Sequence, residues 1–488
     1  MADITLLNMN MLYIKFPDGR IKRDCHLALG PLYLISALKD NGIEVDFRDY
    51  QILDKEELFT PEVFVDFLKN PSKIVGISSM ANLIPFILYA LPYFKEKYPD
   101  TIIILGGVGT ASIEEEILKR FKEVDIIHKG EGELSAPILI KALRDIKSLE
   151  DVPNIYYRKG NQIVFNKKLP RITNLDNIAY PYYNDLDFNI YRGHNILGSR
   201  GCPYPCTFCS ITPIWEHKAY SRSNKSIIDE MKFMSQNFGV KQFLFQDEYF
   251  VSSPKRIIDF SKKLQKEKLD ITYKVFARVD LVNKSSIKAL ADSGCVEIRF
   301  GIESGSDRIL KLTKKGFKSD LAFKVLKLAK KYIRSVDAFY VWGYPFETMD
   351  DFQKSIFQMI SLRGMGIRIL PSLLTFLPQT EIYQKLEDKN KLEFSPYLLP
   401  EYMVMGLENR VSVRIKIHEK YTDFINFIKA NKDIFPGFFS YDINGNIIPK
   451  LGILEEFDFY NKEIDESCGA HSPEIHKDEC NLTLQISD

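Results

Sequence analysis

The sequence of 488 residues predicts an α/β protein: a doubly wound, Rossmann-like parallel sheet, then a partial or full (β/α) barrel and a small, mostly helical C-terminal region. Two observations predict this fold class. Short apolar runs alternate with longer helix-like segments in two separate stretches, a pattern that builds parallel sheets. A segment rich in proline and polar residues separates the two stretches. We therefore expect domains over residues 1–150 and 195–385, a linker over 151–194 and a C-terminal region over 386–488.

The first stretch contains five compact apolar runs that predict strands. We expect the strands at residues 4–8, 44–48, 74–78, 101–105 and 124–127, with helices at 30–41, 83–98 and 112–122. In a doubly wound sheet, ligands bind at the carboxyl ends of the strands. Gly106 and Gly107 directly follow a predicted strand, and their missing side chains would let a ligand or a neighbouring backbone approach. Both are candidate cofactor-binding residues.

The second stretch predicts six strands, each ending in a polar or glycine-rich turn. They begin near residues 195, 242, 273, 296, 338 and 370. Barrel enzymes place their chemistry on the loops after the strands, so polar residues at strand ends are the candidates for a site. Glu347 and Thr348, after the fifth strand, are expected to cap a helix over residues 349–362, because carboxylates and hydroxyls satisfy the free amides of a first turn.

The C-terminal region resembles no motif, and its aromatic residues predict a core of its own over the barrel mouth. These aromatics are Tyr397, Tyr402, Phe424, Phe427, Phe438 and Phe439. A polar tail over residues 463–488 carries Cys468, His471, His476 and Cys480 at a spacing that fits no common metal-ligand pattern. A terminal tract of low hydrophobicity is more often disordered or loosely packed.

Composition excludes several classes of function. Lys plus Arg number 66 against 65 Asp plus Glu, and a net charge of +1 favours neither nucleic acid nor an anionic membrane as the main partner. The longest apolar run, residues 83–94, contains Pro85 and Pro92 and is too short to span a bilayer. The chain opens without a signal-peptide pattern and has seven cysteines, so we expect a cytoplasmic protein with reduced thiols and no transmembrane segment.

The most informative motif is Cys202-Pro-Tyr-Pro-Cys206-Thr-Phe-Cys209. Three thiolates on one loop suit a [4Fe-4S] cluster, and three ligands for four irons leave one iron open to a group that is not a protein side chain. A structural zinc site usually has four ligands, and only His217 follows nearby. A disulfide would require an oxidising compartment. Buried apolar cysteines would not explain three of them on a loop that contains two prolines.

This motif, including Phe208 before the third cysteine, resembles the cluster motif of the radical S-adenosylmethionine (SAM) superfamily. The resemblance implies that Cys202, Cys206 and Cys209 ligate the cluster and that SAM chelates the open iron through its amino and carboxylate groups. Cleavage of SAM would then give a 5'-deoxyadenosyl radical that abstracts hydrogen from an unreactive C–H bond. It also implies an electron donor such as flavodoxin or ferredoxin, and a six-unit partial barrel.

The resemblance gives roles to residues at the strand ends. Gln246 or Asp247 would contact the SAM amino group, with a structural role as the alternative. Gly301-Ile-Glu303-Ser304-Gly305 resembles a family motif whose Glu and Ser lie near the SAM ribose and methionine. Arg278 would pair with the SAM carboxylate in a bidentate fork, or else form a salt bridge with Asp280 or Glu303.

The N-terminal stretch resembles the cobalamin-binding-like domain of one large branch of this superfamily. The resemblance rests on residues 30–38, on Gly106-Gly107 and on Lys129-Gly-Glu-Gly-Glu133. Asp24-Cys-His26 is similar to a cobalt-ligating Asp-x-His-x-x-Gly signature, but one extra residue precedes Gly30. His26 is therefore either a ligand of cobalt, oriented by Asp24, or an ordinary polar residue.

Three functions follow from these observations. The first is a cobalamin-dependent radical SAM methyltransferase that methylates an unactivated carbon. The second is a cobalamin-free dehydratase, cyclase or rearrangement enzyme with the same architecture. The third, a noncatalytic iron-sulfur protein, would have no use for a nucleoside pocket at residues 301–305. No motif selects among organic or peptide substrates.

Overall fold

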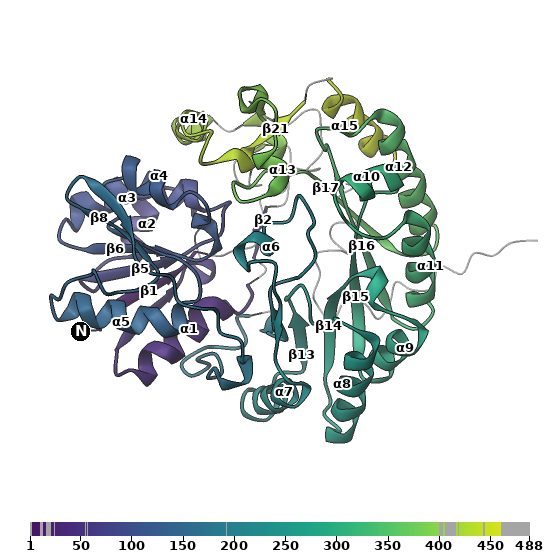
Figure 1. Ribbon diagram of the computed structural model, residues 1–488, viewed down its shortest axis with the longest axis horizontal. Coiled ribbons are helices and arrows are strands. Elements are labelled where there is room, and N and C mark those ends of the chain that lie inside the picture. Colours follow the sequence, from purple (N-terminus) through teal and green to yellow (C-terminus); the bar gives the residue numbers. More distant parts are fainter. Residues whose placement is uncertain are drawn as a thin grey trace, which may run out of the picture.

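The computed structural model describes residues 2–9, 13–15, 21–23, 25–53, 55, 57–191, 193–399, 404–405, 416–417, 419–442 and 445–459. Figure 1 shows an N-terminal sheet domain at the left, a barrel at the right and the last described segments above both. The predicted fold class is confirmed. The predicted polar tail and Asp24 lie outside the described residues.

The N-terminal domain is a seven-stranded sheet in the order β4-β1-β5-β6-β7-β8-β9. Its first five strands are parallel, and numbered along the chain they follow the doubly wound order 2-1-3-4-5. β1 and β5 coincide with their predicted ranges. The strands are β1 Ile4–Asn8, β4 Val45–Asp49, β5 Ile74–Ser78, β6 Ile102–Gly106 and β7 Ile126–His128; the helices are α1 Leu29–Asp40, α2 Pro61–Phe67, α3 Ile84–Lys97, α4 Glu114–Arg120 and α5 Gly132–Arg144.

The sheet continues into the predicted linker. β8 (Ile155–Lys159) and β9 (Gln162–Phe165) form a hairpin, and β8 pairs antiparallel with β7. Gly160 has a φ of +59° in the turn, and the rings of Tyr156 and Phe165 stack 4.4 Å apart across the pair. Edge strands that alternate polar and apolar residues lack the continuous apolar run that marks a buried parallel strand, so the expectation of a linker from residue 151 is corrected here.

The barrel domain is a six-stranded, fully parallel sheet in the order β10-β13-β14-β15-β16-β17. Its helices cover the outer face in Figure 1. The strands are β10 His194–Ile196, β13 Gln242–Phe245, β14 Thr272–Ala277, β15 Cys295–Glu303, β16 Ser335–Trp342 and β17 Arg368–Leu373; the outer helices are α7 Asn224–Phe238, α8 Pro254–Glu267, α9 Lys284–Asp292, α11 Ser319–Ala329 and α12 Met349–Arg363.

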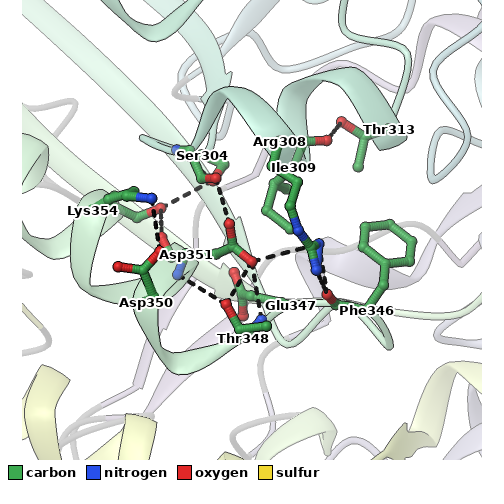
Figure 2. Close-up of polar contacts among 12 residues, drawn as sticks. Ser304, Arg308, Ile309, Thr313, Phe346, Glu347, Thr348, Asp350, Asp351 and Lys354 are labelled. Atoms are coloured by element: carbon green, nitrogen blue, oxygen red, sulfur yellow. Dashed lines mark hydrogen bonds and ion pairs between the residues drawn. The ribbon is translucent and has the colours of Figure 1, made fainter.

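The predicted cap of α12 is confirmed for Thr348 and wrong for Glu347. Thr348 and Asp351 form a capping box, in which each side chain accepts the backbone N–H of the other residue (Figure 2). Glu347 instead accepts the N–H of Gly343 at 2.8 Å and pairs with Lys450 at 2.7 Å. Both members of that ion pair are almost fully buried. Glu347 therefore ties the C-terminal region to the barrel.

The C-terminal region packs on both domains, which corrects the expectation of a separate core. Phe424 of α14 (Thr422–Ala430) lies 6.1 Å from Phe86 and 5.2 Å from Tyr89 of α3, between ring centroids. α15 (Ile447–Glu456) packs on α12. The remaining short strands are β18 Leu392–Phe394, paired with β21 Phe439–Tyr441, β19 Val404–Met405, paired with β20 Lys416–Ile417, and β2 Tyr13–Lys15, paired with β3 Ile21–Arg23. Within the described ranges, no helix combines the length and apolar character needed to cross a bilayer.

Candidate functional site

The three motif cysteines lie on the loop between β11 (Ser199–Arg200) and α6 (Ile211–Ile214). Gly201 opens the loop with a φ of +90°, and a Cβ there would lie 2.3 Å from the carbonyl of Lys218, so only glycine fits. The backbone of Thr207 donates to the carbonyl of Thr313 at 3.1 Å and accepts the N–H of Ile382 at 2.9 Å. These bonds fix the loop against the barrel mouth.

The cysteine loop has the donors that an iron-sulfur cluster requires. Cys202, Cys206 and Cys209 are half-buried free thiols, and burial raises the pKa of Cys202 and raises that of Cys209 to about 11. Across the described residues, no three His, Cys, Asp or Glu side chains come close enough to hold a single metal ion. Three thiols on one loop match the ligand set of a cluster with one open iron, whereas a structural zinc site takes four protein ligands.

Arg278, at the end of β14, lies beside the cysteine loop and does not offer a free fork. Its Nε and Nη2 each lie 3.0 Å from one carboxylate oxygen of Asp280, and Nη2 also donates to the carbonyl of Lys315. Nη1 lies 3.8 Å from the sulfur of Cys206. The salt bridge to Asp280, left open by the sequence, is therefore the arrangement that the structure has.

Glu303 ends β15 inside the barrel mouth. It has a φ of +70°, and its Oε1 accepts from Nζ of Lys315 at 2.8 Å, both side chains being buried. A Cβ on Gly301 would lie 2.4 Å from that Oε1, so glycine makes room for the carboxylate. The Lys315 ammonium lies 6.0 Å from the centre of the Phe208 ring. Lys315 therefore connects Glu303 of the barrel with Phe208 of the cysteine loop.

Tyr344 lies beside Phe208 of the cysteine loop. Its ring contacts Phe208 at 6.0 Å between centroids, edge to face. Its hydroxyl is buried, and among the described residues no group lies within hydrogen-bond distance of it. Burial raises the pKa of Tyr344 well above its usual value, so the hydroxyl stays protonated. A buried hydroxyl without a partner is a donor available to a ligand.

Ser304 lies against a helix. Its hydroxyl is 3.0 Å from that of Ser355 on α12 and accepts the N–H of Ser306 at 3.1 Å. A Cβ on Gly305 would lie 2.5 Å from the carbonyl of Lys354 on α12, so this glycine permits close packing of that helix. The Ser-Gly half of the motif therefore fixes the turn after β15.

The turn after β13 contains Gln246, Asp247 and Glu248, whose side chains differ in environment. Asp247 is buried and accepts from the N–H of Gly198 at 2.8 Å and the hydroxyl of Ser199 at 2.6 Å, so it braces the strand that leads to the cysteine loop. Burial raises the pKa of Asp247 to about 6. All three residues line the cavity described next, in which Gln246 and Glu248 are exposed and Asp247 is buried. Desolvation by the cavity walls raises the pKa of Glu248 to about 7, while part of the residue surface stays exposed.

A cavity of about 460 Å³ joins the two domains. It begins inside the N-terminal domain, where Leu6, Ile104 and Leu139 line it, and passes the carboxyl edge of the sheet at Gly106 and Gly107. A Cβ on Gly107, whose φ is +88°, would lie 2.6 Å from the carbonyl of Ser79. The cavity ends at Gly201 and at residues 246–248 of the barrel. The two glycines therefore lie on a continuous passage from the sheet to the cysteine loop.

Arg200 joins the two domains beside this cavity. Its Nη1 lies 2.9 Å from Oε1 of Glu131 and its Nη2 2.6 Å from Oε1 of Glu133. The three side chains are 7–12% exposed. Glu131 also accepts the N–H of Ile172 at 2.7 Å. The Gly-Glu-Gly-Glu segment thus binds the residue two positions before Cys202.

The cavity contains a histidine other than the predicted one. His26 is not among the lining residues; its ring packs against Gly193, where a Cβ would lie 1.7 Å from Nδ1. His128, at the end of β7, lines the cavity, with Nε2 2.7 Å from the hydroxyl of Ser135. Burial lowers the pKa of His128 to about 4, so the ring is neutral at pH 7.

Sequence reasoning missed Arg200, Glu248 and Lys315. Glu248 adjoins Asp247, and only the contact of Asp247 with Gly198 distinguishes the two acids. Lys315 lies twelve residues beyond Glu303, and no spacing rule connects them. Arg200 could have been found from the sequence. It lies two residues before the cysteine motif, and the glutamates that it binds lie in the Gly-Glu-Gly-Glu segment.

His128 gives a prediction for stability against pH. Its pKa of about 4 lies below the 6.5 of the unfolded chain, so between these values the unfolded state binds more protons and folding weakens as pH falls. At pH 5 this amounts to about 2 kcal/mol. We expect the wild type to lose about that much more unfolding free energy than His128→Gln between pH 7.5 and pH 5, measured by urea unfolding. Equal losses in both proteins would contradict it.

Comparison with known proteins agrees with this geometry. Residues 196–359 match the family model of the radical SAM superfamily, and residues 20–140 match that of the B12 binding domain. An uncharacterized methyltransferase of Pyrococcus horikoshii is 28% identical over 335 residues, which are 67% of this chain and 72% of the relative. An anaerobic magnesium-protoporphyrin IX monomethyl ester cyclase of Synechocystis is 27% identical over 349 residues, 68% of this chain and 67% of the relative.

Among solved structures, the fold is similar to that of the radical SAM methyltransferase TsrM from Kitasatospora setae, solved with cobalamin and a [4Fe-4S] cluster. The TM-score is 0.63 at 17% identity, with coverage of 81% of this chain and 76% of that chain. This likeness concerns the fold.

The cysteine loop on a partial barrel and the family-model match together define an iron-sulfur enzyme that uses SAM. The chain therefore contains a radical SAM domain over residues 196–359, preceded by a B12-binding domain over residues 20–140. Its cofactors are a [4Fe-4S] cluster and SAM, and Cys202, Cys206 and Cys209 are the donors available for the cluster.

Proposed function

We propose that this enzyme is a cobalamin-dependent radical SAM methyltransferase that methylates an unactivated carbon of an organic or peptide substrate. When bound, the cluster and SAM supply a carbon-centred radical, and cobalamin supplies the methyl group. The proposal rests above all on the cavity of about 460 Å³, which connects the apolar interior of the N-terminal domain with the barrel mouth.

The lining of this cavity suits a large planar cofactor with a long substituent. Apolar side chains of the sheet and of α1 and α5 line its deep end, where a nucleotide-like tail would be shielded from water. Gly106, Gly107 and Gly130 at the sheet edge leave a flat surface for a ring system. No role for His26 as a cobalt ligand is part of the proposal, because that residue lies outside the lining.

Four residues of this chain are placed to hold SAM on the barrel side. Glu303 and Lys315 form a buried ion pair, and either member can reach a polar group of the nucleoside or of methionine. Tyr344 offers a hydroxyl donor. Glu248 faces the cavity, and apart from its own backbone N–H it has no partner among the described residues, so its carboxylate is available to an ammonium group.

We assign the substrate to a neighbouring cavity. It measures about 320 Å³ and shares Gly107, Gly130 and Trp215 with the first. Arg171 and Gln379 also line it, so it combines a cation and an amide with apolar surface. An electron donor such as flavodoxin or ferredoxin completes the system, since the cluster must be reduced before SAM is cleaved.

Anaerobic purification with added hydroxocobalamin tests the proposal. We expect about one cobalt per chain, retained on gel filtration, together with 5'-deoxyadenosine formation from SAM under reducing conditions. Mass spectrometry of candidate substrates should then show an added methyl group that carries deuterium from methyl-labelled SAM. SAM cleavage without bound cobalt and without methylated product would instead support the cobalamin-free alternative.

A further inference from the structure

Arg278 makes contacts that neither the cluster motif nor SAM binding accounts for. We propose that Arg278 is a positioning residue that holds Cys206 and raises the reduction potential of the cluster, with Asp280 limiting the effect. The inference rests on the cluster being held by the three cysteines. It is independent of the methyl transfer, because a reduction potential can be measured whether or not cobalamin binds.

The geometry fixes the guanidinium on three sides. Nε and Nη2 donate to the two carboxylate oxygens of Asp280, each at 3.0 Å. Nη2 also donates to the carbonyl of Lys315. The ring of Tyr204, inside the cysteine motif, stacks on the guanidinium with its centroid 3.6 Å from Cζ. Nη1 is then left pointing at the sulfur of Cys206, 3.8 Å away. The arginine side chain is 8% exposed, so little water competes for this N–H.

These contacts have an electrostatic consequence. An arginine is always protonated in proteins, so Arg278 places a permanent positive charge and an N–H donor beside one thiolate of the cluster. Reduction adds a negative charge to the cluster, and both features stabilise the reduced form. Asp280, whose side chain is 23% exposed, opposes this effect with a charge of the other sign. The pair therefore sets the potential through the balance of two charges.

The experiment is a redox titration of the reconstituted cluster, followed by electron paramagnetic resonance in the absence of SAM and cobalamin. Arg278→Gln should disfavour reduction about tenfold, which is about 59 mV more negative for one electron. Asp280→Asn should shift the potential in the opposite direction, and Arg278→Lys should fall between Arg278→Gln and the wild type. Iron per chain, measured on each sample, shows whether the cluster is complete.

Arg363→Gln is the matched control, because Arg363 also stacks on an aromatic ring, Phe459 at 4.6 Å, and donates to a carbonyl, on α12 at the outside of the barrel. Its potential should equal that of the wild type. The proposal is overturned if fully loaded Arg278→Gln and Asp280→Asn both keep the wild-type potential. If Arg278→Gln loads no iron, the potentials of Arg278→Lys and Asp280→Asn are compared with that of the wild type instead. Shifts in opposite directions support the proposal, and unchanged potentials overturn it.

Discussion

Cys206→Ala is expected to lose the visible absorption of the cluster and the cleavage of SAM together, both to background. Cys206 is the middle residue of the motif, and its sulfur lies between the carbonyl of Lys314, at 4.0 Å, and the guanidinium of Arg278. Without it, two thiolates remain on the loop for four irons. Iron content, absorption and 5'-deoxyadenosine after anaerobic reconstitution measure the effect.

Cys295→Ala is the matched control for this variant. Cys295 is also a free thiol, but it is buried in β15, and its sulfur donates to the carbonyl of Glu297. The control should keep its iron and its SAM cleavage. Formation of 5'-deoxyadenosine by Cys206→Ala under reducing conditions would refute the assignment of the cluster to this loop.

Gly106→Leu is expected to weaken cobalamin binding by about 100-fold or more, which corresponds to about 2.8 kcal/mol. A Cβ at Gly106 meets no atom within 4 Å, and its φ is not positive, so the backbone accepts a side chain that then fills the cavity. The iron content and the SAM cleavage of the barrel should stay at wild-type levels. Equilibrium dialysis with hydroxocobalamin and iron analysis make the comparison.

Gly452→Leu provides the control, since Gly452 in α15 also has no atom within 4 Å of its built Cβ and lies away from the cavity. It should bind cobalamin like the wild type. Wild-type affinity in Gly106→Leu would show that the corrinoid does not occupy this cavity, and the proposed methyl transfer would lose its main support.

The elements that the sequence predicted best are those buried on both faces. Residues 4–8 and 74–78 form strands with those bounds, because a parallel strand between two layers of helices is largely apolar and forms a short run that is easy to recognise. The hairpin over residues 155–165 was missed because one edge of it faces solvent. β15 runs three residues past Phe300, since Gly301 leaves space inside the strand for the carboxylate of Glu303.

Prediction of the site succeeded where one loop carries the whole motif and failed where a partner comes from elsewhere in the fold. The three cysteines lie within eight residues of one another along the chain, so spacing alone brings them together. Arg278 could not be assigned from sequence, because its choice between Asp280 and a cofactor carboxylate depends on where the Lys315 carbonyl and the Tyr204 ring lie. The roles of Asp247 and Glu248 depend in the same way on Gly198.

The ion pairs of Arg200 limit how this chain can be recombined with its relatives. Separating the two domains would leave Arg200, Glu131 and Glu133 without their ion-pair partners. Removing one partner of a buried ion pair typically destabilises the folded protein by about 3–5 kcal/mol. A chimera that takes its sheet domain from another protein must therefore inherit the Gly-Glu-Gly-Glu segment together with a matching arginine before the cysteines. For protein engineering, the unit to exchange is therefore the pair formed by this segment and this arginine. A fusion point between residues 133 and 200 would separate the two halves of that pair.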